Sequence, residues 1–383
     1  MTDKADQQKK KHIAMIGQKH VPSREGGVEI VVWELATRLR DAGYDVDCYN
    51  RSGYHLSGKD YTKIPGKRGY YKDGIRIIII PTFHNSKLNA IVYSLLGTIR
   101  AVFGHYDVIH FHAEGPCIML WLPKLFGIHV IATIHGLDWQ RAKWGNFASR
   151  MIKAGEKTAA KYADEVIVLS KDVQDYFRKV YGRETRYIPN GISKPERRPA
   201  HLITKQYGLQ GNDYIYTLSR IVPEKGIHYL IEAYSRIQTD KKLVIIGGNG
   251  NADDYWNEIR KLAKQDSRII MTGFIEGEVL QELCSNAYLY VLPSDVEGMS
   301  VSLLESMSYG NCCLISDIPE NLEVVEDKAV FFRQGDVNNL QDILQKLLEH
   351  PEEVEEYQKA SSDYICSRYS WDKMVAETQK LYK

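Results

Sequence analysis

Short apolar runs alternate with helix-like segments along almost the whole chain, and this alternation limits the fold more than any other feature. Residues 75–80, 165–169 and 243–247 are typical of these runs, since isoleucine, valine and leucine dominate them. Strands that are buried on both faces have this composition, and strands that are separated by helices pair in parallel. The sequence therefore predicts an α/β protein whose parallel sheets are covered by helices.

A polar, proline-rich stretch, residues 194–199, interrupts the alternation near the middle of the chain. A chain of 383 residues is long enough for two or three domains. The first residues are polar and charged, with no long apolar stretch behind them, so we expect a disordered leader and no signal peptide. The expected boundaries are 1–11 for the leader, 12–193 for the first domain, 194–213 for the linker and domain entry, 214–368 for the second domain and 369–383 for a final helix.

The 50 basic and 49 acidic residues nearly cancel, to a net charge of +1. A nucleic-acid-binding protein would need a clustered basic excess, so we expect no nucleic acid partner. None of the six cysteines stands in a C-x-x-C spacing, and we therefore expect reduced thiols in a cytoplasmic protein without a zinc site or redox pair. Asp253 and Asp254 lie in a polar stretch that predicts a loop or helix start, and we expect no metal site there.

Two glutamates flank a predicted loop-to-helix junction. Residues 288–293 read as a buried strand closed by a proline, and residues 301–307 read as the helix that follows. Glu297 then lies on the loop and Glu305 on the helix. The exposed amides of the first helical turn would bind an anion between these two carboxylates. The arrangement suits a ligand with an anionic centre and hydroxyl groups on both sides, such as a nucleoside diphosphate sugar.

Two cations follow another predicted strand, at residues 214–216. Arg220 and Lys225 stand five positions apart in a loop before an amphipathic helix, so both can reach one diphosphate. Arginine supplies a planar fork of donors and lysine a compact charge, which suits two non-equivalent phosphates. With these cations, no metal ion would be needed to offset the charge of a diphosphate leaving group.

Paired glycines, Gly26 and Gly27, precede a predicted helix over residues 28–40. Without side chains there, the backbone at the helix start can approach a phosphate or a sugar closely. The G-x-G-x-x-G pattern of dinucleotide-binding proteins is absent, which weighs against a nicotinamide or flavin enzyme.

The paired glycines, the two cations and the two glutamates follow one another along the chain. Together they resemble the motifs of the retaining glycosyltransferases of family 4, and the resemblance covers nearly the whole chain. The resemblance implies the GT-B fold, in which two Rossmann-like domains face each other and the C-terminal helix crosses back to the first domain. It implies that Glu297 contacts the donor sugar, that Glu305 holds the ribose, and that Arg220 and Lys225 hold the diphosphate. It also places the turn at residues 273–275 against the nucleobase. The donor-binding residues that we expect are Gly26, Gly27, Arg220, Lys225, Gly248, Phe274, Ile275, Glu297, Gly298, Met299, Ser300, Val301 and Glu305.

Histidines follow two short apolar runs, at the end of parallel strands where α/β folds place their ligands. His110 and His112 share one side of an extended chain. We weigh a core role and a site role equally for His110. By the resemblance, His112, His135 and Asp138 contact the acceptor, and His112, Arg220, Lys225 and Glu297 form the catalytic set.

The chain departs from the family pattern at three positions. Met299 and Ser300 replace the more usual aromatic residue and glycine, and Asn311 stands where proline is common. Both glutamates and the amide-rich turn are retained, so these changes bear on packing and on the fit of the donor sugar. Residues 22–29 resemble the subgroup that contains bacterial polysaccharide rhamnosyltransferases.

No membrane-spanning helix is expected, because charged residues interrupt both long apolar stretches. One of these stretches has an apolar helical stripe, for which the core is the default location. If the stripe is exposed, it would bring the protein to a lipid-linked acceptor at the inner face of a membrane. The stripe consists of Leu88, Ile91, Val92, Leu95, Leu96, Ile99 and Val102.

The sequence thus predicts a metal-independent glycosyltransferase without a cofactor. It would move a hexose or deoxyhexose from a nucleoside diphosphate sugar to a hydroxyl of a glycan or lipid-linked acceptor, in the synthesis of cell-surface polysaccharide or glycoconjugate. A nucleotide-sugar epimerase and a non-catalytic sugar-binding protein are the alternatives. The base, sugar, acceptor, linkage and oligomeric state stay open, as does the choice between same-face attack and a covalent intermediate.

Overall fold

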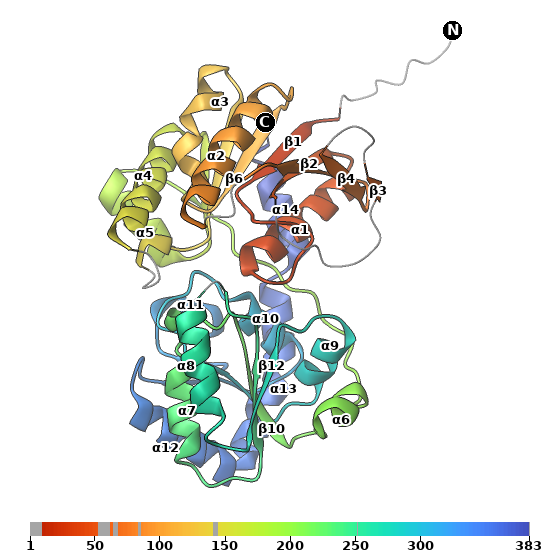
Figure 1. The fold of residues 1–383 in the computed structure, drawn as a ribbon, viewed down its shortest axis with the longest axis vertical. Helices are drawn as coiled ribbons and strands as arrows, with labels where there is room; N and C mark the ends of the chain where they lie inside the picture. Colours follow the sequence, from red (N-terminus) through yellow and green to blue (C-terminus); the bar gives the residue numbers. More distant parts are fainter. Residues whose placement is uncertain are drawn as a thin grey trace.

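The computed structural model describes residues 10–52, 62–63, 68–82, 86–140, 145–250 and 252–382. These residues form two α/β domains, one above the other in Figure 1, each built on a largely or wholly parallel sheet. Residues 1–9 of the expected leader lie outside the described residues. Lys11, also placed in that leader, donates a hydrogen bond from Nζ to the carbonyl oxygen of Tyr382 at 2.9 Å.

The described strands of the first domain form a sheet in the order β3-β4-β5-β2-β1-β6-β7-β8-β9. Neighbours from β5 to β9 are parallel, as the alternating sequence predicts, and β3 and β4 extend one edge as antiparallel strands. The strands are β1 (His12–Ile16), β2 (Asp45–Arg51), β3 (Thr62–Lys63), β4 (Gly69–Lys72), β5 (Ile75–Ile80), β6 (Val108–His112), β7 (His129–Ile134), β8 (Glu165–Val168) and β9 (Arg186–Tyr187).

Helices cover both faces of this sheet. On one face, apolar residues of α1 (Gly27–Asp41) and α14 (Trp371–Gln379) share a core with inward side chains of β1 and β2. On the other face, a second core joins alternate residues of the same strands to the remaining helices. Those are α2 (Ser86–Val102), α3 (Trp121–Leu125), α4 (Asn146–Tyr162) and α5 (Lys171–Tyr181), with the 3₁₀ turns η1 (Pro116–Met119) and η2 (Asp138–Gln140).

The apolar stripe on α2 is only partly in the core, so the default expectation for it is wrong at its centre. Ile91, Leu95, Leu96 and Ile99 are exposed, whereas Val102 is buried. The side chain of Leu88 lies outside the described residues.

The second domain has an all-parallel sheet in the order β12-β11-β10-β13-β14-β15. One face packs against α7, α8 and α12, and the other against α6, α9, α10 and α11. Its elements are α6 (Leu202–Tyr207), β10 (Tyr214–Leu218), η3 (Pro223–Lys225), α7 (Ile227–Ser235), β11 (Lys242–Ile246), α8 (Asp253–Ala263), β12 (Ile269–Gly273), α9 (Glu278–Ser285), β13 (Leu289–Leu292), α10 (Val301–Ser308), β14 (Cys313–Ser316), α11 (Pro319–Val325), β15 (Val330–Phe332), α12 (Val337–Glu349) and α13 (Pro351–Arg368).

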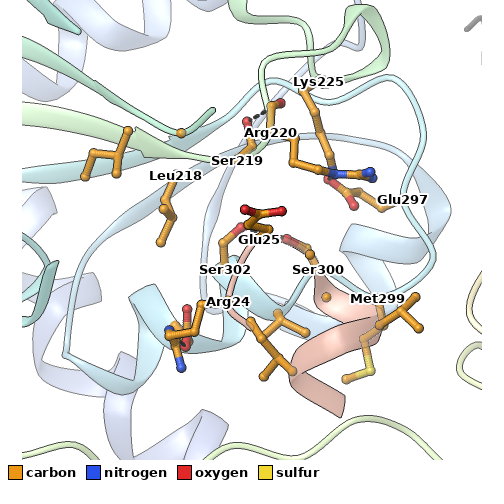
Figure 2. A pocket seen from close by; sticks show the side chains of 18 of the residues that line it. Arg24, Glu25, Leu218, Ser219, Arg220, Lys225, Glu297, Met299, Ser300 and Ser302 are labelled. Atoms are coloured by element: carbon orange, nitrogen blue, oxygen red, sulfur yellow. Dashed lines mark hydrogen bonds and ion pairs between the residues drawn. The ribbon is translucent and has the colours of Figure 1, made fainter. Parts of the chain in front are cut away.

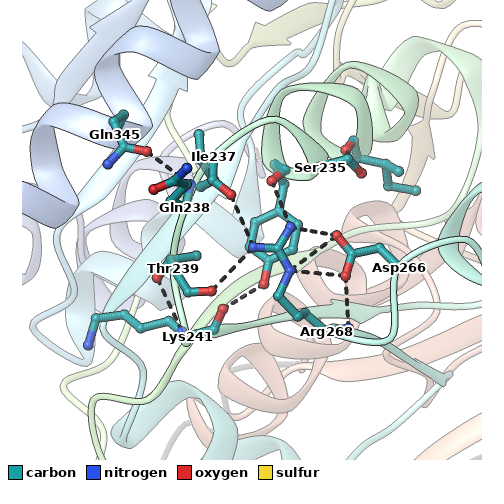
Figure 3. A network of polar contacts seen from close by, with 10 residues as sticks. Ser235, Ile237, Gln238, Thr239, Lys241, Asp266, Arg268 and Gln345 are labelled. Carbon is teal, nitrogen blue, oxygen red and sulfur yellow. Dashed lines mark hydrogen bonds and ion pairs between the residues drawn. The ribbon is translucent and has the colours of Figure 1, made fainter.

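A half-buried arginine closes the end of α7 that points away from the first domain. The guanidinium of Arg268 donates to the carbonyl oxygens of Ile237 and Thr239 and pairs with Asp266 at 2.7 Å (Figure 3). It also lies over the ring of Tyr234. Carbonyl groups that follow a helix have no partner within the helix, so this side chain satisfies them and ties α7 to the start of β12.

The chain crosses between the domains twice, and the two crossings touch. Ile192 forms an isolated parallel bridge with Ser370. A Cβ added to Gly191 would lie 2.1 Å from the backbone nitrogen of Trp371, so only glycine allows this approach. Beyond the second crossing, α14 packs against α1 and lies among the elements of the upper domain in Figure 1.

Candidate active site

A cavity lies between the two domains, where the loop after β1 faces the loops at the carboxyl ends of β10, β11 and β13. Every residue of the expected donor-binding set lines it, and so does His135 of the expected acceptor set. Figure 2 shows that Glu25 of the first domain faces Arg220, Lys225 and Glu297 of the second, while Arg24 lies at the other side of the cavity. The roles of these residues remain predictions, but the fold brings them together.

The N-terminus of α10 forms one wall of the cavity. The loop after β13 ends at Ser300, whose hydroxyl accepts a hydrogen bond from the backbone nitrogen of Leu303 at 3.3 Å. Gly298, Met299, Ser300, Val301 and Ser302 all line the cavity. The unpaired amides of the first turn and the positive end of the helix dipole therefore face the space between the domains, which favours an anion there.

Lys225 and Glu297 form an ion pair at this wall. Nζ of Lys225 lies 2.5 Å from Oε1 of Glu297, and the hydroxyl of Ser294 donates to the same oxygen at 2.7 Å. Lys225 ends the turn η3, and a Cβ on the next residue, Gly226, would lie 2.0 Å from the carbonyl oxygen of Pro293. This close contact between the two loops holds the lysine and the glutamate against each other. Figure 2 shows the guanidinium of Arg220 beside the pair.

A second ion pair joins the domains across the cavity, and sequence reasoning missed one of its partners. The guanidinium of Arg24, in the loop before Gly26, pairs with the carboxylate of Glu305 on α10. The charge of Glu305 is the main cause that raises the pKa of Arg24. The available signal was the position of Arg24 and Glu25 directly before the paired glycines. Each glutamate of the predicted donor site is thus paired with a cation in this structure.

The two domains are in contact beside Glu297. A Cβ added to Gly298 would lie 1.7 Å from the carbonyl oxygen of His135, and one added to Gly136 would lie 2.9 Å from Cα of Gly298. Gly136 also has a φ of 146°, which disfavours any other residue. The glycine after Glu297 is therefore required by the approach of the first domain.

His112 does not line the cavity and lies one residue behind it. Its Nδ1 is 3.2 Å from Nε2 of His135, its Nε2 is 3.4 Å from Sδ of Met15, and its ring stacks on His110. Burial, and after it the neighbouring His110 and His135, lowers the pKa of His112 well below its usual value. A neutral His112 can therefore orient His135, which does line the cavity.

His110 is a core residue. Its ring nitrogens lie 2.9 Å from the hydroxyl of Tyr382 and 2.7 Å from that of Thr133. Burial lowers its pKa to about 3, so the ring is neutral at physiological pH. The core role that the sequence weighed equally with a site role is the one that the structure supports.

Asp138 does not line the cavity either, but it belongs to a turn that is held by two buried carboxyl groups. The backbone nitrogen of Asp138 donates to Glu114 at 2.8 Å, and Nε1 of Trp139 donates to Glu156 at 3.0 Å. Burial, then the charges of Asp138 and Glu156, raises the pKa of Glu114 well above its usual value. Glu156 also accepts from the hydroxyl of Tyr176 at 2.8 Å. Sequence reasoning missed both glutamates. The signal that could have found them is that each is an isolated acidic residue, Glu114 after an apolar run and Glu156 in a basic segment.

The described residues also bear on metal, thiol and membrane chemistry. No group of three histidine, cysteine, aspartate or glutamate side chains among them could hold a metal ion. All six cysteines are free, and five of them are buried. Within the same ranges, the helices are too short or too polar to cross a membrane.

Two family models match the chain, one in each domain. The model "Glycosyltransferase Family 4" matches residues 25–194, and "Glycosyl transferases group 1" matches residues 201–363. The UDP-Gal:alpha-D-GlcNAc-diphosphoundecaprenol alpha-1,3-galactosyltransferase of Escherichia coli is 26% identical over 68% of this chain and 70% of its own length.

Solved structures show the same fold. Sucrose-phosphate synthase from Thermosynechococcus elongatus superposes with a TM-score of 0.81 at 22% identity, covering 97% of this chain and 98% of its own. HepE of Anabaena, solved in complex with UDP-glucose, has a TM-score of 0.77 at 17% identity, covering 97% and 99%.

The chain belongs to glycosyltransferase family 4, the glycosyl transferases group 1, and has the GT-B fold. It is a retaining glycosyltransferase that transfers sugars from nucleotide sugars. Membership of this family decides against the epimerase and the non-catalytic sugar-binding protein. The names of the relatives above do not support the narrower resemblance to rhamnosyltransferases.

Proposed function

We propose that this enzyme moves a hexose or deoxyhexose from a nucleoside diphosphate sugar onto a hydroxyl of a glycan or a lipid-linked acceptor. The observation that carries the proposal is the meeting of two cations, two carboxylates and a helix N-terminus in one cavity between the domains. In the proposed complex, Arg220, Lys225 and the first amides of α10 hold the diphosphate. Negative charge develops on this group as the glycosidic bond breaks, so these donors stabilise the transition state without a metal ion.

The two ion pairs indicate how the donor enters. Glu305 would exchange Arg24 for the hydroxyl groups of the ribose, and Glu297 would turn from Lys225 toward the sugar. Lys225 is then released to the diphosphate. Phe274, Ile275 and Gly248 also line the cavity, and we assign the nucleobase to them.

The acceptor would enter from the first domain, at His135. This residue lines the cavity and contacts both the loop of Glu297 and His112. The named E. coli relative acts on a diphosphoundecaprenol-linked sugar, which supports a lipid-linked acceptor and a role in polysaccharide or glycoconjugate synthesis. The enzyme would then work at the inner face of a membrane. A rhamnosyl donor remains a hypothesis that rests on residues 22–29 alone.

Thermal unfolding with UDP, TDP, GDP and ADP tests the donor site. A ligand at about 100 times its dissociation constant adds about 2.7 kcal/mol of stability. We expect one nucleotide to raise the melting temperature of the native protein and not that of Glu305→Ala. Glu184→Ala is the matched control, because Glu184 is exposed in the first domain and away from the cavity.

Transfer activity completes this test. Lys225→Ala and Glu305→Ala should each abolish transfer from the nucleotide sugar selected by the first assay, while Glu184→Ala retains it. Full turnover by either cavity variant would overturn the site assignment. Loss of activity in chelator, restored by a divalent ion, would contradict metal independence.

A further inference from the structure

Helix α2 is apolar on its solvent-exposed side as well as on the side that packs into the core. Ile91, Leu95, Leu96 and Ile99 are 38 to 40% exposed. The buried side carries the core residues Tyr93 and Ala101, and Asn89, Ser94 and Thr98 are buried as well. A surface helix of a globular protein normally has charged and polar residues on its exposed face. The outward side of α2 is therefore built for an apolar environment.

The short helix α3 extends this apolar surface. Leu125 is 73% exposed, Phe126 57% and Trp121 40%, and Phe103 just beyond the end of α2 is 69% exposed. The rings of Phe103 and Phe126 meet edge to face, with centroids 6.0 Å apart, so the two helices contribute to one patch. Contiguous apolar patches of this kind mark interaction sites.

The neighbouring helix α4 is basic on its exposed side. Arg150, Lys153, Lys157 and Lys161 recur at helical spacing and are exposed. The single acidic residue of α4, Glu156, is fully buried, and neither α2 nor α3 contains an acidic residue. Both α2 and α4 contact the segment formed by η1 and α3, so the three helices share one side of the first domain.

We propose that this side of the first domain, the outer faces of α2, α3 and α4, docks on an anionic lipid bilayer. Apolar side chains that enter the interface and cations that meet acidic headgroups are the two components of such binding. Charge complementarity favours a bilayer over a second copy of the chain, because a symmetric dimer would bring two basic α4 helices together. The purpose of this membrane contact rests on the proposed function: it would bring a lipid-linked acceptor to the domain that carries His135.

Cosedimentation of the full-length protein with vesicles tests the proposal. One set of vesicles contains phosphatidylcholine alone, and the other contains equal parts of phosphatidylcholine and phosphatidylglycerol. We expect binding to the anionic vesicles that weakens with salt. Each cation near an anionic surface contributes about fivefold to partitioning, so Arg150→Glu with Lys157→Glu should reduce it by at least about 25-fold. The double variant Leu125→Ser with Phe126→Ser should also reduce partitioning onto the anionic vesicles.

The matched control reverses two charges on the second domain, with Lys261→Glu and Lys359→Glu on α8 and α13. It has the same net charge as the α4 variant and should bind vesicles much as the native protein does. Equal loss in both variants, or no binding by the native protein, would overturn the proposal. Light scattering that shows a dimer, which Leu125→Ser with Phe126→Ser dissociates, would assign the patch to a second copy instead. The stability gained with the preferred nucleotide, measured on the same samples, checks folding and tests the donor site independently of the membrane.

Discussion

At the scale of single residues, Gly298 shows how a contact between domains can resemble a ligand contact. Its position directly after Glu297 predicted a role in donor binding, and it does line the cavity. The missing side chain is nevertheless explained by the carbonyl oxygen of His135 in the other domain. The residue thus reports how closely the two domains approach each other.

Gly298→Ala should therefore impair catalysis more than donor binding. The added methyl group would hold the first domain away, and a misplacement of about 1 Å can lower a rate about 100-fold. We expect such a loss in kcat, measured from initial rates of transfer, while the nucleotide still raises the melting temperature. Gly211→Ala is the control, since its new Cβ would meet nothing within 4 Å. Native kcat in Gly298→Ala would contradict this explanation.

Sequence reasoning identified the charged residues that the second domain contributes to the cavity, but it missed Arg24 of the first domain and the pairing of the charges. Lys225, Glu297 and Glu305 stand in motifs with recognisable spacing, so their types and order were informative. Arg24 stands outside those motifs and reaches Glu305 only because the two domains face each other. The sequence could not show that His112 lies behind His135. Alternation along a strand predicts the face of the sheet on which a side chain lies, but not how far that side chain is from the cavity.

At the scale of elements, strand β6 carries histidines that stay uncharged in the folded protein. His110 lies between Tyr382 and Thr133, with no carboxylate among its hydrogen-bonding partners. In the unfolded chain a histidine binds a proton near pH 6.5, whereas burial lowers the pKa of folded His110 to about 3. Between these values the unfolded state binds more protons, so acid favours unfolding.

The free energy of unfolding should thus decrease as the pH is lowered from 6.5 toward 3, by about 1.4 kcal/mol per pH unit from His110. In His110→Gln, which keeps a polar side chain near Tyr382 and Thr133, the decrease should be shallower by that amount. Urea unfolding at several pH values measures it. His350→Gln, at an exposed position, should keep the native slope. Parallel pH curves for the native protein and His110→Gln would show that this histidine does not control acid stability.

The central parallel strands were predictable, and β2 was not. Strands such as β5 and β11 are nearly uniform apolar runs, whereas β2 contains the buried polar residues Asp47 and Asn50. Asp47 is paired with Arg76 and His12, and Asn50 donates to the carbonyl oxygen of Val21 at 2.8 Å. Buried polar groups are stable when they are bonded in this way, but the partners lie far away in sequence. The apolar side of α2 was ambiguous as well, because helical periodicity shows that apolar residues share a side but not whether that side is buried or exposed.

At the scale of the whole molecule, the two crossings that connect the domains lie side by side. Closure of two domains around a substrate excludes water and completes a site. The bridge between Ile192 and Ser370 couples the two crossings, so they should act as one hinge. The absent side chain of Gly191 is what allows this pairing.

Gly191→Ala should destabilise the protein, because its Cβ would overlap the backbone of Trp371. Overpacking of a tight contact typically costs about 1–3 kcal/mol, and urea unfolding should show a loss in that range. Gly115→Ala is the control, since its new Cβ would meet nothing within 4 Å and its φ of −55° suits alanine. Equal stability of Gly191→Ala and the native protein would mean that the crossings can separate at little cost.

The return of α14 to the first domain also sets an order of events during synthesis. The core of the first domain includes Trp371, Met374, Leu381 and Tyr382. The hydroxyl of Tyr382 also forms a hydrogen bond with His110. A ribosome that has made every strand of this domain must still translate the whole second domain before these residues emerge. The first domain therefore begins to form before the second but is completed after it. Until α14 emerges, the side of its core formed by β1 and α1 is left uncovered.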